Sequence, residues 1–269
     1  MSLANDRVAL VTGSSRGIGA AIAKKLGQAG ARVIVHANKS TEDAEGVARN
    51  ISPDGSRAAA IQGDLASGDG PKQVVASAFR KFGALDILVN NAAVFEGGSV
   101  DGLSAGQIDR VLAVNVRSVF LTIREFVLVT KSEDGRIVSI SSIAGHLPSP
   151  GGSLYAASKA AVESLTKSLA VELGPRKITV NAVAPGTTET EMSLHGFPSE
   201  LLTLNAAVTP LGGLGRPDQV AEAVALLCSD SAGWITGQVL GADGGQLTTM
   251  AVLRRIQDAI ERQSRQKAA

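Results

Sequence analysis

The chain joins an apolar run to a glycine-rich loop at Val8-Ala9-Leu10-Val11-Thr12-Gly13-Ser14-Ser15-Arg16-Gly17-Ile18-Gly19, and an amphipathic pattern follows. A strand, a glycine loop and a helix in this order can form a phosphate cradle. The glycines let the backbone approach a pyrophosphate, and the helix N-terminus stabilises its negative charge. The spacing is Gly-x-x-x-Gly-x-Gly instead of the commoner Gly-x-Gly-x-x-Gly. Taken alone, the loop is therefore compatible with a dinucleotide site and also with a plain tight turn.

Outward from this loop, short runs rich in Val and Ile alternate with helical patterns, which is typical of βαβ units and a parallel sheet. We therefore predict an α/β fold: a Rossmann-type, doubly wound parallel sheet of about seven strands with helices on both faces. Ligands of such sheets bind beyond the carboxyl ends of the strands. The strands are expected at residues 8–11, 32–36, 58–62, 86–90, 135–141, 178–184 and 238–241, and the helices at 17–28, 41–50, 71–82, 105–129, 155–173 and 217–227.

No linker interrupts the chain between residues 7 and 245, so residues 1–248 are predicted to form a single dinucleotide-binding and catalytic domain. Two regions escape the alternation, 186–215 and the tail. In 249–269, apolar residues recur at helical spacing, which predicts a C-terminal helical extension. Its apolar stripe needs a surface, either on a neighbouring subunit or on its own. The stripe consists of Val252, Leu253, Ile256, Ala259 and Ile260.

Composition excludes several classes of function. The formal charge of +1 over 269 residues gives no reason to expect nucleic acid or a membrane surface as a partner. Residues 1–7 hold no apolar signal segment, and no stretch approaches 18 apolar residues, so a cytoplasmic protein is expected. Cys228 is the single cysteine and lies in an apolar run, which indicates a buried thiol. His36, His146 and His195 show no metal-binding spacing.

Tyr155, the single tyrosine, precedes Lys159 by four residues on a predicted helix, and Ser142 lies thirteen residues upstream. The i, i+4 spacing places the phenol and the ammonium on one helix face. Bringing a phenol with a pKa of about 10 close to 7 takes roughly 4 kcal/mol, which a neighbouring ammonium and a nicotinamide cation could supply in a water-poor cleft. The set predicts hydride transfer on a carbonyl or an alcohol. The competing interpretation is a surface helix with a cation near a ring, together with serines that cap a turn.

From residue 7 to about residue 247, the chain resembles the short-chain dehydrogenase/reductase family, most closely its 3-oxoacyl-carrier-protein reductase branch. The resemblance implies that Tyr155 is the acid/base, and that Lys159 holds the nicotinamide ribose and lowers the pKa of the tyrosine. Ser142 would orient the substrate oxygen. Asn115 would anchor a water chain that relays protons to Lys159. The motifs that carry the resemblance are Thr12–Gly19, Asp64, Asn90-Asn91-Ala92-Ala93, Asn115, Ser142, Tyr155-x-x-x-Lys159, Pro185-Gly186, Thr188 and Thr190.

The same resemblance implies the cofactor contacts. Asp64, with Leu65 beside it, would receive the adenine amino group, and Thr188 and Thr190 would grip the nicotinamide carboxamide. One departure is Ala93, which stands where the family usually has glycine. The cofactor-binding residues predicted in this way are Gly13, Ser15, Arg16, Gly17, Ile18, Gly19, Asn38, Lys39, Ser40, Asp64, Leu65, Asn91, Ala92, Ala93, Tyr155, Lys159, Pro185, Gly186, Thr188 and Thr190.

The end of the second predicted strand favours NADP(H) over NAD(H) as the cofactor. NAD-binding sheets of this kind carry an acid there that binds the ribose 2′-hydroxyl, and this chain has Ala37. Lys39 and Ser40, with Arg16 in the glycine loop, can supply cationic and hydroxyl donors to a 2′-phosphate. Alternatively, Lys39 is a solvated loop charge and Arg16 contacts only the protein.

The predicted function is an NADP(H)-dependent oxidoreductase that transfers a hydride between the nicotinamide and a ketone or secondary alcohol. The alternatives are a 3-oxoacyl-carrier-protein reductase and a redox sensor that binds the dinucleotide without turnover. The resemblance also places a substrate lid near 186–215 and implies a homotetramer. The apolar residues of that lid favour a hydrophobic small-molecule substrate over a phosphorylated sugar, although simple packing would explain them as well.

Overall fold

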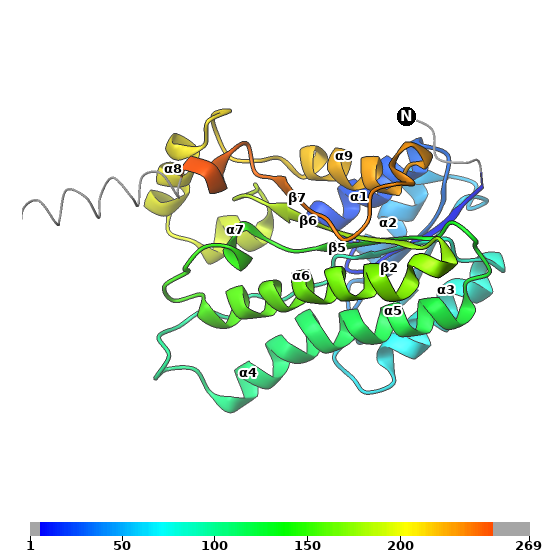
Figure 1. Cartoon of the computed structure of the whole chain (residues 1–269), viewed down its shortest axis with the longest axis horizontal. Coiled ribbons are helices and arrows are strands. Elements are labelled where there is room, and N and C mark those ends of the chain that lie inside the picture. Colours follow the sequence, from blue (N-terminus) through cyan, green and yellow to red (C-terminus); the bar gives the residue numbers. More distant parts are fainter. Residues whose placement is uncertain (1–5, 250–269) are drawn as a thin grey trace, which may run out of the picture.

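In the computed structural model, which describes residues 6–249, seven parallel strands form one sheet with the order β3-β2-β1-β4-β5-β6-β7 (Figure 1). The predicted doubly wound sheet is therefore confirmed. Residues 250–269, which hold almost all of the predicted helical extension, lie outside the described part. The strands are β1 (Val8–Val11), β2 (Arg32–Ala37), β3 (Ala58–Gln62), β4 (Ile87–Asn90), β5 (Arg136–Ile140), β6 (Thr179–Pro185) and β7 (Val239–Ala242).

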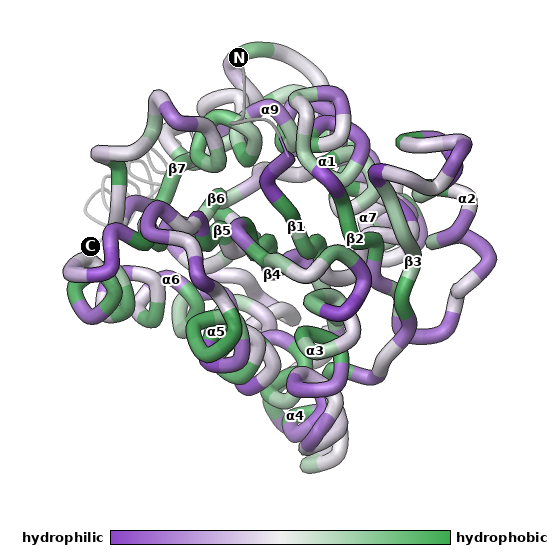
Figure 2. The backbone as a smooth tube through the Cα atoms, turned by 90° about the vertical axis from the view of Figure 1, so that its right-hand side faces the viewer, coloured by the Kyte–Doolittle hydropathy of each residue, from purple (hydrophilic) through white to green (hydrophobic). Residues whose placement is uncertain are grey.

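Helices cover both faces of this sheet (Figures 1 and 2). One face packs against α1, α2 and α9, and the other against α3, α5 and α6. The bounds of these helices are α1 (Gly17–Gln28), α2 (Thr41–Ile51), α3 (Gly70–Phe82), α5 (Ser118–Val129), α6 (Ser153–Leu173) and α9 (Pro217–Cys228).

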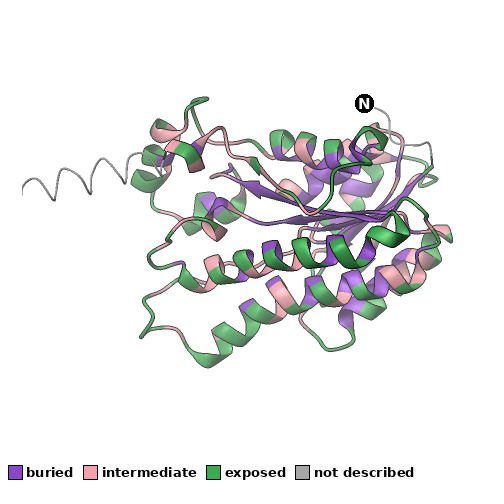
Figure 3. Cartoon of the chain, in the orientation of Figure 1, coloured by how far each residue is buried: buried purple, intermediate pink, exposed green. Residues whose placement is uncertain are grey.

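The two apolar cores follow from strand geometry. Successive side chains of a strand point to opposite faces. Accordingly Val8 and Leu10 enter one core, while Ala9 and Val11 enter the other. Because both faces are covered, the inner strands are mostly apolar and lie buried at the centre of the molecule (Figure 3), whereas the edge strands β3 and β7 are only partly buried. The loops at the carboxyl ends of the strands remain accessible, and the predicted site residues lie there.

Two segments differ from the prediction. The helix expected at 105–129 consists of α4 (Ala105–Leu112), a π-helical turn η1 (Ala113–Arg117) and α5. Its centre carries Asn115, and π-turns of this kind are frequent at functional sites. The irregular segment 186–215 holds two helices, α7 (Glu191–Gly196) and α8 (Ser199–Val208).

Within residues 6–249, no helix is both long and apolar enough to cross a membrane. The same residues bring together no group of three His, Cys, Asp or Glu side chains that could hold a metal ion. Cys228 is fully buried at the end of α9, and burial raises the pKa of its thiol to about 12. A thiol of this kind is a packing group, as the sequence indicates.

Candidate active site

Predicted site residues follow the ends of six strands. The glycine loop follows β1, Asn38 follows β2, Asp64 follows β3, Asn91 follows β4, Ser142 follows β5 and Gly186 follows β6. Since all strands are parallel, these positions share one edge of the sheet. The first two turns of α6 add Tyr155 and Lys159 to the same edge.

Ser142 and Tyr155 form a hydroxyl pair. Ser142 begins the short helix η2 (Ile143–Gly145), where its Oγ accepts a hydrogen bond from the Ala144 amide at 3.2 Å. Burial raises the pKa of Tyr155 to about 12, and a hydrogen bond with Ser142 lowers it part of the way back. The protein by itself therefore gives the opposite direction to the lowering implied by the family resemblance, because loss of hydration outweighs the Ser142 bond. At neutral pH the phenol holds its proton.

Lys159 lies on α6, one helical turn after Tyr155. Its side chain is 3% exposed, and its Nζ donates to the Ile140 carbonyl at 2.8 Å. The Nζ lies 5.4 Å from the centre of the Tyr155 ring, as the one-turn spacing predicts. Burial lowers the pKa of Lys159 to about 8. The ammonium is therefore held in place by α6 and β5, and it loses its proton more easily than a surface lysine.

Asn115 is 1% exposed and links two parts of the site. Its side-chain oxygen accepts from the Val94 amide at 2.9 Å, and its Nδ2 donates to the Val94 carbonyl at 2.9 Å. The same Nδ2 donates to Ser158 Oγ at 3.1 Å, which in turn donates to the Tyr155 carbonyl at 2.7 Å. Asn115 thus ties the segment after β4 to α6. Its described partners do not include Lys159, so the water relay stays a prediction.

The glycine loop has the features of an anion cradle. Helix α1 begins without a side-chain cap, so amides of its first turn are left to an external acceptor. Gly13 has φ +61°, and an added Cβ there would lie 2.8 Å from the Ala92 Cα. An added Cβ at Gly19 would collide with the Gly13 carbonyl oxygen and approach the Ser14 Cα to 2.8 Å. A backbone so bare and so closely packed fits a dinucleotide pyrophosphate.

Asn91 supports this loop from β4. Its Nδ2 donates to the carbonyls of Thr12 and Gly13, each at 2.9 Å. Thr12 Oγ1 in turn accepts from the amides of Asn91 at 3.0 Å and Ala92 at 3.1 Å. Ala93 does not have a positive φ, so the methyl group that replaces the usual glycine brings no backbone strain. The side chain of Asn91, which the sequence predicts to contact the cofactor, therefore holds the glycine loop in place.

The residues predicted to bind the 2′-phosphate differ in exposure. Ala37 is buried, whereas Asn38 and Lys39 are exposed, and Ser40 begins α2 without making a side-chain cap. Arg16 is also exposed and forms an ion pair with Glu191 of α7 at 2.8 Å. Exposed ion pairs of this kind are worth about 0–1 kcal/mol. Arg16 is therefore free to exchange its carboxylate partner for a phosphate.

The other predicted cofactor residues lie on both sides of the cradle. Asp64 is exposed and accepts from the Ala66 amide at 2.9 Å, while Leu65 is buried, so only its backbone is available to a ligand. Thr190 begins α7 and faces the glycine loop, because an added Cβ at Gly17 would lie 3.7 Å from its methyl group. Thr188 Oγ1 donates to the Gly186 carbonyl at 2.9 Å. Buried Pro185 ends β6, and Ser15 and Ile18 are half-buried in the loop.

Sequence reasoning missed Phe95, and it placed Phe197 in the apolar lid without pairing it with the site. The ring of Phe95 meets that of Tyr155 edge to face at 5.3 Å between centres, and that of Phe197 in the same way at 5.5 Å. Phe95 belongs to the segment after β4, and Phe197 ends α7. No local pattern pairs residues so far apart in the sequence. Only the tertiary fold shows that Phe95, with Phe197 packed against it, lies beside the Tyr155 phenol.

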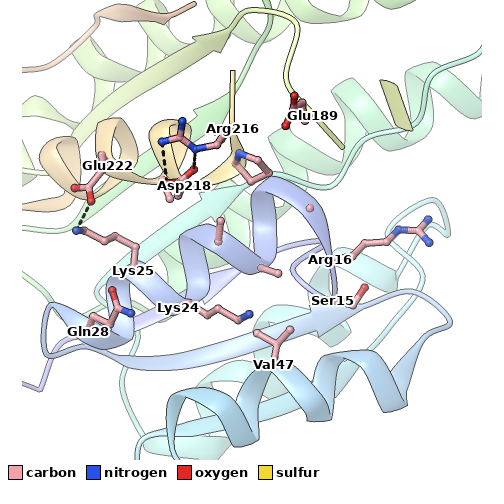
Figure 4. A pocket seen from close by; sticks show the side chains of 15 residues that line it. Ser15, Arg16, Lys24, Lys25, Gln28, Val47, Glu189, Arg216, Asp218 and Glu222 are labelled. Carbon is pink, nitrogen blue, oxygen red and sulfur yellow. Dashed lines mark hydrogen bonds and ion pairs between the residues drawn. The ribbon is translucent and has the colours of Figure 1, made fainter. Parts of the chain in front are cut away.

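A pocket of about 690 Å³ adjoins the glycine loop on its other side, between α1 and the start of α9 (Figure 4). Ser15, Arg16, Lys24 and Arg216 line it, but Tyr155 does not. The candidate catalytic residues therefore lie at the edge of the sheet that holds Tyr155, outside this pocket.

Comparisons with known proteins find similar chains over most of this sequence. A family model described as enoyl-(acyl carrier protein) reductase matches residues 13–246. Versicolorin reductase stcU of Emericella nidulans is 41% identical over an alignment of 253 residues, and the match covers 90% of this chain and 96% of that protein.

Two solved structures extend the comparison. A short chain dehydrogenase from Burkholderia cenocepacia in complex with NADP is 43% identical, with a TM-score of 0.85 over 90% of this chain and 98% of that one. The landomycin C-6 ketoreductase LanV with bound NADP and rabelomycin is 36% identical, with a TM-score of 0.83 over 92% and 98% of the two chains.

Proposed function

This chain belongs to the short-chain dehydrogenase/reductase family, and on that premise we propose that it is an NADP(H)-dependent reductase of hydrophobic ketones. The observation that carries the proposal is the Ser142–Tyr155 hydroxyl pair above Lys159, at the edge of the sheet that also holds the glycine loop. The names of its NADP-bound relatives support the choice of cofactor.

The residues of the chain divide the work on the ketone. Ser142 donates a hydrogen bond that holds the carbonyl oxygen beside Tyr155. The reduced nicotinamide, when bound, supplies a hydride to the carbonyl carbon. Tyr155 gives its phenolic proton to the oxygen, which completes the secondary alcohol. Lys159 is held one turn below, where its positive charge stabilises the phenolate that remains.

The wall beside the phenol points to the substrate class. The Phe95 ring packs against Tyr155, and the Phe197 ring packs against Phe95. A flat aromatic ketone would add another edge-to-face or offset contact, worth about 0.5–1.5 kcal/mol beyond the apolar area it buries. We therefore propose aromatic ketones as the preferred substrates.

A substrate panel tests the proposed function. NADPH oxidation would be followed at 340 nm with a bicyclic aromatic ketone, an aliphatic ketone of similar size and an acetoacetyl thioester. We expect the highest kcat/KM with the aromatic ketone. The thioester represents the 3-oxoacyl-carrier-protein reductase alternative. If the protein binds NADPH and turns over no member of the panel, the redox-sensor alternative replaces the enzyme.

Cofactor choice gives a second prediction. Lys39→Ala should weaken NADPH binding about tenfold and leave NADH binding within about twofold, because only NADPH carries a 2′-phosphate that loses a charge-assisted hydrogen bond. Lys131→Ala is the matched control, since Lys131 is also exposed but lies just after α5, near the start of β5. Kd values from calorimetry decide the matter. Equal losses for both dinucleotides would show that Lys39 does not read the phosphate.

The pKa of Tyr155 gives a prediction about pH. With that pKa raised to about 12, the phenol stays protonated from about pH 6 to about pH 9. Ketone reduction uses the protonated form, so its initial rate should not rise over this range. Alcohol oxidation needs the phenolate, whose population grows about tenfold per pH unit below the pKa, so its initial rate should climb. A reduction rate that climbs with pH would contradict the role of Tyr155 as proton donor.

Assembly as a homotetramer is also proposed, because large apolar side chains are exposed on two faces. One face lies on α4 and α5. The other joins Val171 on α6 to the segment before β7, where Gly237 packs against Ala170. The exposed residues are Ile108, Leu112, Phe120 and Leu128 on the first face, and Val171, Trp234 and Ile235 on the second.

Trp234 can report on the second interface, since it is the single tryptophan of the chain and is fully exposed here. If the tetramer buries it, its emission maximum should be blue-shifted at micromolar protein and move to the red on dilution. Light scattering on the same samples would give the mass. A tetramer whose tryptophan still emits as in water would place the second interface elsewhere.

A further inference from the structure

His36, one residue before the end of β2, lies beneath the glycine loop and is 1% exposed. Its Nδ1 accepts a hydrogen bond from the Gly13 amide at 3.0 Å, and its Nε2 lies 3.0 Å from the Gly63 carbonyl. An amide can only donate and a carbonyl can only accept. These two partners therefore require the neutral ring with its proton on Nε2.

The backbone around His36 is fastened to the same loop. The Ser14 amide donates to the His36 carbonyl at 2.8 Å, and the His36 amide donates to Ser14 Oγ at 3.0 Å. These bonds hold Ser14, but the described partner of the Gly13 amide is the His36 ring. The peptide before Gly13 is thus held from both sides, because Asn91 binds its carbonyl group and the His36 ring binds its N–H.

We propose that His36 is a positioning residue for the dinucleotide. Its Nδ1 fixes the Gly13 peptide so that the loop presents its amides to the pyrophosphate. Its Nε2–H ties the same unit to Gly63, next to Asp64, at the predicted adenine site. This inference rests on the proposed function, because it takes the glycine loop to be the cofactor cradle.

Acid should break this arrangement. A doubly protonated ring would turn Nδ1 into a donor that faces the Gly13 N–H, so two donors would oppose each other. Burial lowers the pKa of His36, so the neutral ring persists into mild acid. The charged residues on the segments packed around the ring are Arg16, Lys39 and Asp64, and all three are exposed. A buried imidazolium would therefore be poorly compensated.

Two substitutions separate the nitrogens. Asparagine carries its amide where histidine has Nδ1, so His36→Asn can keep the acceptor for Gly13 and loses the bond to Gly63. Glutamine reaches the position of Nε2, so His36→Gln can keep the bond to Gly63 and loses the acceptor for Gly13. Each variant gives up one hydrogen bond of the ring. Their melting temperatures should therefore fall by similar amounts.

Calorimetric Kd values for NADPH and NADH decide the proposal. We expect His36→Gln to raise both Kd values about tenfold, because the buried Gly13 N–H loses its acceptor. The Kd values of His36→Asn should stay within about threefold of wild type. The wild-type Kd should rise when the pH is lowered far enough into acid to protonate the ring, and that of His36→Asn should not. Equal Kd values for the two variants would overturn the positioning role. A wild-type protein that binds neither dinucleotide would instead overturn the proposed function.

Discussion

Tyr155→Phe should lower kcat for ketone reduction at least about hundredfold, a loss of about 2.7 kcal/mol of transition-state stabilisation. In the proposed mechanism the phenol is the proton donor, and no other side chain described at its position can replace it. Ser142 would orient the substrate oxygen, and Lys159 is held by the Ile140 carbonyl at 2.8 Å. The edge-to-face contact of Phe95 does not involve the hydroxyl group at position 155, so the variant should keep this contact and the fold.

Binding provides the control for this substitution. The phenylalanine variant should bind NADPH within about twofold of wild type, because the glycine loop and Lys159 are unchanged. Single-turnover measurements with saturating NADPH would isolate the chemical step. A variant that retains more than about a tenth of wild-type kcat would remove the acid/base role from Tyr155.

The sheet and the positions of the candidate catalytic residues could be predicted because their signals are local. Apolar runs such as Val8–Val11 mark strands that are buried on both faces, and the Tyr155–Lys159 spacing needs only one helix. Parallel strands then bring the loops at their carboxyl ends to one edge without further information. That reasoning correctly predicts which loops gather, and it does not place individual side chains in them.

The rest depends on long-range contacts. The pairing of Phe95 with Phe197 joins the segment after β4 to the lid, and the ring of His36 meets Gly13 and Gly63 from two other loops. At Asn115 the α-helical hydrogen-bond pattern changes to a π-helical one, and the spacing of apolar residues in the sequence does not reveal this change. The pKa of Tyr155 in the protein by itself is set by desolvation, a property of the packed site that the spacing of Tyr155 and Lys159 does not reveal.

Gly19→Ala should weaken NADPH binding on the order of hundredfold and lower the free energy of unfolding by about 1–3 kcal/mol. The new methyl carbon would collide with the Gly13 carbonyl oxygen and lie 2.8 Å from the Ser14 Cα. Both atoms belong to the backbone of the loop, so relief requires the loop to move. A displaced loop would lose two or more of its hydrogen bonds to the pyrophosphate, each worth about 1.5–3 kcal/mol when the acceptor is charged.

Gly46→Ala is the matched control for this effect. Gly46 lies inside α2, and an added Cβ would meet no atom closer than 4.0 Å, at Arg49. Alanine there should stabilise the helix by about 0.5–1 kcal/mol and leave NADPH binding unchanged. Calorimetric titration and thermal unfolding of both variants separate a local clash from a general intolerance of alanine. If Gly19→Ala bound NADPH as tightly as Gly46→Ala, the loop at residues 12–19 would not be the cofactor cradle.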